Sequence, residues 1–252
     1  MMDMKKLVTL FVVAALALAN LTGAGALADN ENGVVIEKLE SDFALQNDVK
    51  NANSVFKGEL PYWYLSPSHD DKTIGRWITK APTYKTEKLS DAEDNNFPLY
   101  WKAGDSVSQW NDALGIEATY HSGGNVDIFI HGGTLEEINV LLSKRGIKPL
   151  SLESNGYTTH EKYDDATYTY NGKEITGYSL QAAHVYIIYK PRGENFTQAQ
   201  YECVILHELG HAFGYIGHSS NPLDVMWYME NGRTTLGIRD INHLKQVYDK
   251  WR

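Results

Sequence analysis

Residues that could carry chemistry gather between positions 207 and 218, where three histidines and one glutamate lie close together in the chain. His207 and His211 are four residues apart. On a helix this spacing places both imidazoles on one face, so that both can reach a single Zn²⁺ ion. Glu208 lies about 100° further round the helix, where its carboxylate can contact a metal-bound water but is poorly placed as a ligand. These residue types at this spacing predict a metal site that activates water.

A third ligand is available just beyond the helix. Gly214 can adopt the left-handed conformation that ends a helix, and the chain can then turn back and bring His218 to the same metal. Three protein ligands leave a fourth position for water, which describes a catalytic zinc rather than a closed structural one. The alternative is a buried helix that happens to carry two histidines. The glycine, the third histidine and the downstream Met226 argue against that alternative.

The stretch 207–226 resembles the metzincin zinc peptidases, whose pattern is H-E-x-x-H-x-x-G-x-x-H followed by a methionine turn. A serine follows His218 and a methionine closes the segment, which is similar to the matrixin branch of that family. There is one departure, because three residues rather than two separate Gly214 from His218, and Gly217 stands where the family has its third histidine. We assign His218 because its spacing to Met226 fits the family and the two glycines give a turn that can absorb one residue.

The resemblance implies an α+β fold of the zincin type. A twisted, mostly parallel sheet would carry the active-site helix, and a C-terminal subdomain would hold the methionine turn and a final helix over 238–248. Met226 would form an apolar floor beneath the ligands, although a plain core methionine would pack in the same way. Tyr228 stands at a spacing from which a tyrosine contacts the metal or the transition state in the astacin and serralysin branches. Matrixins more often place that tyrosine directly after the methionine, where this chain has Trp227.

The same resemblance implies a zinc endopeptidase that acts on a peptide or protein substrate. His207, His211 and His218 would hold one Zn²⁺, and Glu208 would act as the general base toward its water. An extended peptide would lie antiparallel to an edge strand of the sheet. One alternative is a catalytically inactive, zinc-containing binding or adhesion protein of the cell surface, which would have no need of Glu208. Another is an enzyme that acts on the cell envelope rather than on proteins at large.

The N-terminal segment predicts export. A basic start and the short apolar run 7–19 are typical of a secretory signal peptide, which we place at 1–28 with cleavage after Ala28. The alternative is a retained membrane anchor, but Asn20 interrupts the apolar run, so we expect no membrane association after cleavage. Residues 29–58 are polar and rich in asparagine, and we expect a leader or short propeptide there. The catalytic domain would then span 59–252.

Composition narrows the class of protein further. Removal of the signal peptide from 252 residues leaves a single domain of ordinary size, expected to be a monomer. The formal net charge of −9 argues against nucleic acid as a partner, because no basic stripe is available to neutralise phosphates. The single cysteine, Cys203, cannot form an internal disulfide, and an exported chain without one is more typical of bacteria than of animals. We expect Cys203 to be a small buried residue of the active-site helix.

Periodicity and turn residues predict the surrounding elements. Short segments rich in β-formers predict strands at 63–65, 76–79, 116–120, 126–130 and 184–189. Helices are predicted over 100–114, with Trp101, Val107 and Trp110 on the apolar side, from Thr134 to Gly146, and after the N-cap residue Thr197. Asn171 and Gly172 predict the turn of a hairpin over 168–176.

The block 134–176 has no counterpart in the matrixin pattern, and we interpret it as an insertion near the cleft. Asp164 and Asp165 could bind a structural Ca²⁺, but a solvated loop is the preferred interpretation, so calcium is without support. The remaining histidines show no ligand spacing, and each is expected to be structural or exposed: His69, His121, His131, His160, His184 and His243.

Overall fold

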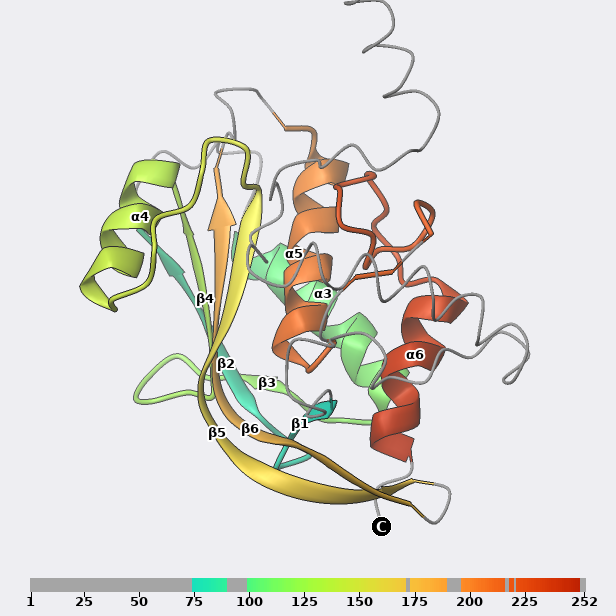
Figure 1. Ribbon diagram of the computed structural model, residues 1–252. Helices are drawn as coiled ribbons and strands as arrows, with labels where there is room; N and C mark the ends of the chain where they lie inside the picture. Colours follow the sequence, from blue (N-terminus) through green and yellow to red (C-terminus); the bar gives the residue numbers. More distant parts are fainter. Residues whose placement is uncertain are drawn as a thin grey trace, which may run out of the picture.

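The computed structural model describes residues 74–89, 99–170, 173–189, 196–215, 218–219 and 221–249. These residues form an α+β fold with a mostly parallel six-stranded sheet (Figure 1). The predicted signal peptide at 1–28, the leader at 29–58 and the strand at 63–65 lie outside the described residues. Within the described part of the chain, no helix is both long enough and apolar enough to span a bilayer.

The sheet is built around a long strand that pairs along both of its edges. The strands are β1 (Ile74–Trp77), β2 (Thr83–Lys88), β3 (Thr119–Tyr120), β4 (Ile128–Gly133), β5 (Gly156–Tyr170) and β6 (Lys173–Ile188). Strand β6 pairs in parallel with β1 and β4, and β2 lies in parallel between β4 and β3. Strand β5 runs antiparallel to β6 and pairs with no other described strand. It is therefore the antiparallel edge of a parallel sheet.

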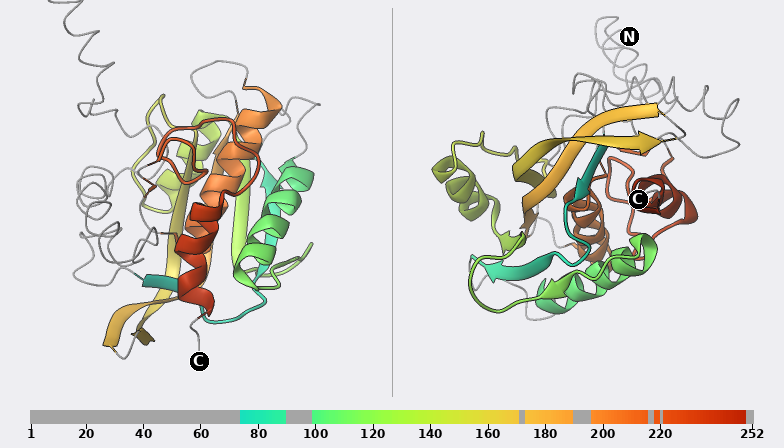
Figure 2. Two further views of the ribbon diagram at one scale, coloured as in Figure 1. Left: turned by 90° about the vertical axis from the view of Figure 1, so that its right-hand side faces the viewer. Right: turned by 90° about the horizontal axis from the view of Figure 1, so that it is seen from below.

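Helices cover both faces of the sheet. Helices α3 (Leu99–Leu114), α5 (Gln198–Ala212) and α6 (Ile238–Asp249) lie on one face, and α4 (Leu135–Lys144) lies on the other (Figures 1 and 2). Successive residues of a strand point to opposite faces, so Val185 and Ile187 of β6 join the large core with α5, whereas Tyr186 and Ile188 pack in the smaller core with α4.

Local sequence explains where the helices around the site begin. Thr197 caps α5 and Thr134 caps α4, and each forms the complete reciprocal capping box predicted from its sequence. Helix α5 is buried almost all round, as expected for an apolar helix at the centre of the core. Its side chains are therefore held by packing from every direction, which suits a helix that must fix functional groups.

Several element boundaries differ from the prediction. Strand β1 ends at Trp77 rather than at residue 79, and the strand predicted over 116–120 is reduced to β3. Trp101 was expected on the apolar side of its helix, but it is 65% exposed. The reason is the helical period, because Leu99 and Ala103 lie on the buried face of the helix. Trp101 is two residues from each of them, which corresponds to about 200° of rotation, so its side chain points to solvent.

The block 134–176 is an integral part of the sheet. It supplies α4 and the edge strand β5, and the predicted hairpin is formed by β5 and β6, with residues 171 and 172 outside the described part. Asp164 and Asp165 have exposed side chains, as predicted, but they lie in β5 rather than in a loop. Strand β6 begins at Lys173, well before the predicted start at residue 184, because it pairs with β5 along this whole length.

Candidate metal centre

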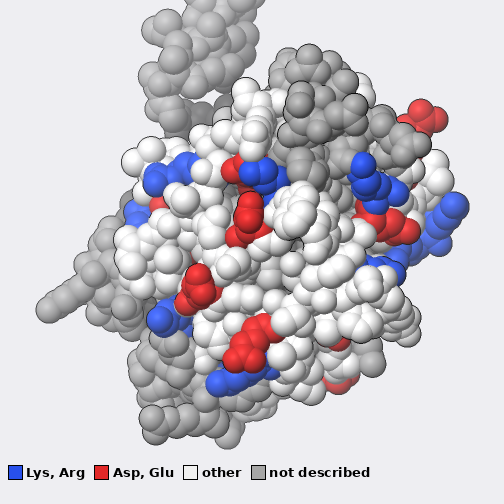
Figure 3. All heavy atoms as spheres, turned by 180° about the vertical axis from the view of Figure 1, so that it is seen from behind, with Lys and Arg blue, Asp and Glu red and all other residues white. Residues whose placement is uncertain are grey.

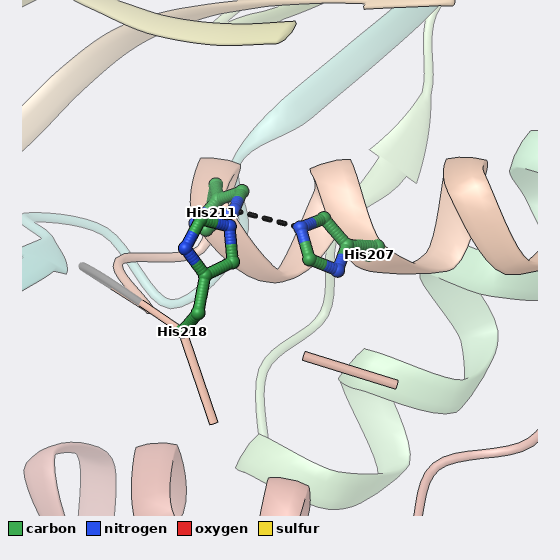
Figure 4. Close-up of side chains that lie close together, drawn as sticks. All are labelled: His207, His211 and His218. Atoms are coloured by element: carbon green, nitrogen blue, oxygen red, sulfur yellow. Dashed lines mark hydrogen bonds between the residues drawn. The ribbon is translucent and has the colours of Figure 1, made fainter. Parts of the chain in front are cut away.

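Three histidines converge at the C-terminal half of α5 (Figure 4). His207 and His211 project from successive turns of the helix, and His218 reaches them from the chain beyond it. One ring nitrogen of each histidine lies within 4.8 Å of those of the other two, and all three residues are buried. Among the described residues this is the one group of three or more histidine, cysteine or acidic side chains that could hold a metal ion.

Backbone carbonyls orient the two helical histidines. His207 Nδ1 lies 2.8 Å from the carbonyl oxygen of Val225, and His211 Nδ1 lies 2.6 Å from that of Tyr215. A carbonyl oxygen only accepts, so each Nδ1 carries the proton and donates. Each Nε2 is then left as a lone-pair donor facing the centre, which is the arrangement that metal-binding histidines require.

The distance between those two nitrogens tests whether a metal fits. His207 Nε2 and His211 Nε2 are 3.0 Å apart. Two nitrogens bound to one tetrahedral zinc at about 2.0–2.1 Å would be about 3.3 Å apart, so only a small adjustment is needed. Burial lowers the pKa of His207 to about 4 and holds that of His211 well below its usual range, so both rings are neutral near pH 7. Two facing lone pairs at this distance repel each other, and a cation between them relieves the repulsion.

Gly214 marks where the chain leaves α5, ahead of the third histidine. Gly214 has a φ of +102°, and a Cβ at this position would lie 2.0 Å from the carbonyl oxygen of Gly75 in β1. Only glycine satisfies both constraints, so the predicted helix stop at Gly214 is confirmed. The His218 ring lies 5.2 Å from that of His207 and 5.1 Å from that of His211, measured between centroids. The extra residue in the motif therefore does not keep His218 from the cluster.

The predicted methionine turn lies directly against the helix. Met226 is fully buried, and a Cβ placed on Gly210 would lie 2.4 Å from its Sδ. The methionine thus packs against the helical turn between the two metal-binding candidates, as an apolar floor requires. Tyr228 lies further along the chain and packs against Trp227 with ring centroids 4.3 Å apart. A contact of Tyr228 with a transition state stays a prediction.

Sequence inspection missed the polar residues that hold this segment in place. Asp224 accepts hydrogen bonds from Ser219 Oγ at 2.5 Å and Arg239 Nε at 3.0 Å, which ties the chain beyond His218 to α6. Asp240 of α6 accepts from the backbone N–H groups of Val225, Met226 and Gly237. Neither aspartate gives a sequence signal for such a role, because its partners are brought close only by the fold.

Glu208 is buried and lies against the edge strand β5. It is 1% exposed, and burial raises its pKa to about 8, while a hydrogen bond from Thr158 opposes that rise. A small pocket opens beside Glu208 and His207, with Asn155, Cys203, Val204 and Glu230 as its other lining residues. A carboxyl group whose pKa lies near neutrality is suited to taking up and releasing a proton.

A second pair of buried histidines lies on the other face of the sheet. His131 of β4 and His184 of β6 are linked by a contact of 2.9 Å between Nε2 and Nδ1. Glu87 lies 2.8 Å from His131 Nδ1, and Glu161 lies 3.0 Å from His184 Nε2. The nitrogens of each ring face different partners, so the four groups form a row rather than a chelating cluster. We predicted that each histidine is structural or exposed, and their pairing was missed because the register of β4 on β6 was not predictable.

Charged residues are interspersed on the face seen in Figure 3, where acidic and basic side chains lie next to one another.

No protein-family model matches the chain, and no curated protein matches it. Membership of a peptidase family therefore stays a prediction based on the motif at 207–226.

Proposed function

We propose that the protein is a zinc-dependent endopeptidase of the metzincin type, with the matrixins as the most similar branch. The observation that supports this most strongly is the convergence of His207, His211 and His218 beside the buried carboxylate of Glu208. The proposal includes export after removal of 1–28 and action on peptide or protein substrates outside the cell. The proposed cofactor is one Zn²⁺, because three imidazoles with an open fourth position are typical of catalytic zinc.

Each residue has a distinct part in the proposed reaction. Zinc bound by the three histidines would supply a water of lowered pKa and polarise the scissile carbonyl. Glu208 takes a proton from the attacking water and later delivers it to the leaving amine, so that the carboxylate is regenerated. The carbonyls of Val225 and Tyr215 hold the rings of His207 and His211 in the required tautomer throughout.

The edge strand offers a place for the substrate backbone. Strand β5 is antiparallel to β6, and its other edge pairs with no described strand. An extended peptide can add to such an edge through main-chain hydrogen bonds, with its side chains pointing alternately toward and away from the site. Since Thr158 of β5 contacts Glu208, a peptide bound along this edge would pass close to the general base.

The test combines zinc content with peptide cleavage for three proteins that lack residues 1–28. We expect stoichiometric zinc and chelator-sensitive cleavage in the wild type. Glu208→Gln should retain zinc and lose about 10²–10⁴-fold in kcat, because the amide cannot take the proton. Glu202→Gln is the matched control, since Glu202 lies on the same helix and pairs with Lys102 away from the cluster. Cleavage by Glu208→Gln at the wild-type rate would contradict the mechanism.

Two further outcomes separate the alternatives. Zinc binding without cleavage of any peptide in a broad library would favour a binding or adhesion protein. Cleavage of cell-envelope peptides but not of denatured proteins would favour an envelope enzyme with the same catalytic groups.

A further inference from the structure

The side chain of Glu208 is held by two residues of the edge strand. Thr158 Oγ1 lies 2.7 Å from Glu208 Oε2 and 3.0 Å from the backbone oxygen of Glu208. When Glu208 is ionised, both of these atoms are acceptors, and the single hydroxyl proton of Thr158 is shared between them. Gly156 is two residues earlier and therefore faces the same side of β5. A Cβ at Gly156 would lie 2.7 Å from Glu208 Oε1, so the carboxylate occupies the space that a side chain would fill.

This contact does more than satisfy a buried polar group. A glutamate side chain has several rotamers, and a general base must be held close to one geometry to act efficiently. Threonine is β-branched and has a restricted χ1, so the direction of its hydroxyl is fixed by the register of β5. The absence of a side chain at Gly156 leaves the space that the carboxylate occupies. Together the two residues restrict the orientation of Glu208 from the strand side.

The contact also distinguishes the two oxygens of the carboxylate. A hydroxyl proton directed at Oε2 keeps that oxygen as an acceptor. Oε1 is then the oxygen that we expect to take the proton from water and to return it to the amine. Because Thr158 belongs to the strand on which the substrate backbone is proposed to lie, one strand would set the position of both the substrate and the base.

We propose that Thr158 is a positioning residue that orients the carboxylate of Glu208 for proton transfer, with Gly156 leaving the space for it. This inference rests on the proposed peptidase function. Thr158 acts through Glu208 and does not itself exchange a proton with the substrate. A threonine that only linked β5 to α5 would affect folding stability but would leave the turnover of correctly folded enzyme unchanged.

The kinetic test compares Thr158→Val, which removes the hydroxyl at nearly constant shape, with Thr158→Ser, which retains it. We expect Thr158→Val to lower kcat about 10–100-fold, with KM and zinc content within about twofold of the wild type. Thr158→Ser should recover most of the lost kcat. Thr167→Val is the matched control, because Thr167 is an exposed threonine elsewhere on β5. A wild-type kcat in Thr158→Val, or an equal loss in Thr158→Ser, would overturn the inference.

A second measurement needs neither zinc nor activity. In metal-free protein, Thr158→Val should lower the midpoint of thermal unfolding by roughly 2–4 °C. The shift should be smaller when Glu208→Ala is already present, because only the contact with the backbone oxygen of residue 208 then remains to be lost. Additive shifts would mean that the side-chain contact is absent and would overturn the inference.

If wild-type protein cleaves peptides but Thr158→Val is unaffected, only the role of Thr158 fails. If wild-type protein with stoichiometric zinc cleaves nothing, the proposed function fails and the role of Thr158 with it.

Discussion

Asp240 accepts a hydrogen bond of 3.1 Å from the backbone N–H of Met226, and this contact links the C-terminal helix to the candidate metal centre. The same carboxylate accepts from the N–H of Val225 at 3.1 Å. The carbonyl of Val225 in turn accepts the Nδ1 proton of His207. The orientation of a metal-binding histidine therefore depends on a residue that lies more than thirty positions further along the chain.

Replacing Asp240 with asparagine should weaken metal binding. The side-chain amide group would face at least one backbone N–H, and donor would oppose donor in a fully buried position. We expect zinc affinity to fall about 10–100-fold and the free energy of unfolding to fall by about 1–3 kcal/mol. Chelator competition measures the first effect and urea unfolding the second. Asp112→Asn, at an exposed position of α3, should change neither. Unaltered zinc affinity in Asp240→Asn would show that Val225 is held by other contacts.

Two helical glycines should respond in opposite ways to alanine. Gly104 of α3 has room, since a Cβ there would meet only the Tyr84 hydroxyl at 3.6 Å, so Gly104→Ala should stabilise the protein by about 0.5–1 kcal/mol. Gly210 of α5 has none, because a Cβ there would lie 2.4 Å from Met226 Sδ and 2.8 Å from Trp110 Cζ2. Gly210→Ala should destabilise by about 1–3 kcal/mol and lower zinc affinity. Thermal unfolding of both variants checks the signs, and stabilisation by Gly210→Ala would show that Met226 does not press against the helix.

Local patterns predicted the candidate ligands because a helix converts sequence spacing directly into geometry. His207 and His211 needed only the 3.6-residue period, and Thr197 and Gly214 marked where the helix begins and where the chain turns. His218 is brought to the cluster as predicted because the glycine turn fixes the return of the chain.

Contacts between distant elements could not be predicted in the same way. Thr158 meets Glu208 across 50 residues, and this requires knowing that β5 is the strand beside α5 and which of its faces turns inward. His131 and His184 meet only because β4 pairs with β6 in a register that places His131 opposite Tyr186. A shift of that register by one residue would separate the two rings, and no local pattern fixes it.

The buried pair His131 and His184 should make stability depend on pH. Burial is the main cause that lowers the pKa of His131 to about 4 and that of His184 to about 3. Glu87 partly opposes the effect of burial on the pKa of His131, and Arg145 adds to the effect of burial on the pKa of His184. In the unfolded chain both titrate near 6.5. As the pH falls from about 6.5 to about 4, the unfolded state takes up protons that the folded state does not. The free energy of unfolding must therefore decrease over this range.

Urea unfolding of metal-free protein between pH 7 and pH 5 measures this effect. Each histidine contributes a slope of up to about 1.4 kcal/mol per pH unit, so His184→Gln should give a shallower dependence than the wild type. His121→Gln is the control for the loss of an imidazole, since His121 is exposed and lies apart from the pair. When both rings are neutral, His131 and His184 have two N–H protons between them for three contacts: with Glu87, with each other and with Glu161. Glu87 is exposed, so its carboxylate can turn to water where no proton is available. Equal slopes in all three proteins would mean that the pair is protonated in the folded state.

Metal removal should destabilise the protein through the same three histidines. A ligand that binds only the folded state adds RT ln(1 + [L]/Kd), or about 2.7 kcal/mol at a free concentration 100 times Kd. A chelator should therefore lower the unfolding midpoint by roughly 5–10 °C, and added zinc should restore it. His218→Ala removes one ligand, so its midpoint should respond far less to zinc, whereas His121→Ala should respond as the wild type does. A full zinc response in His218→Ala would mean that a different residue completes the site and that the extra residue after Gly214 has displaced the motif from its proposed alignment.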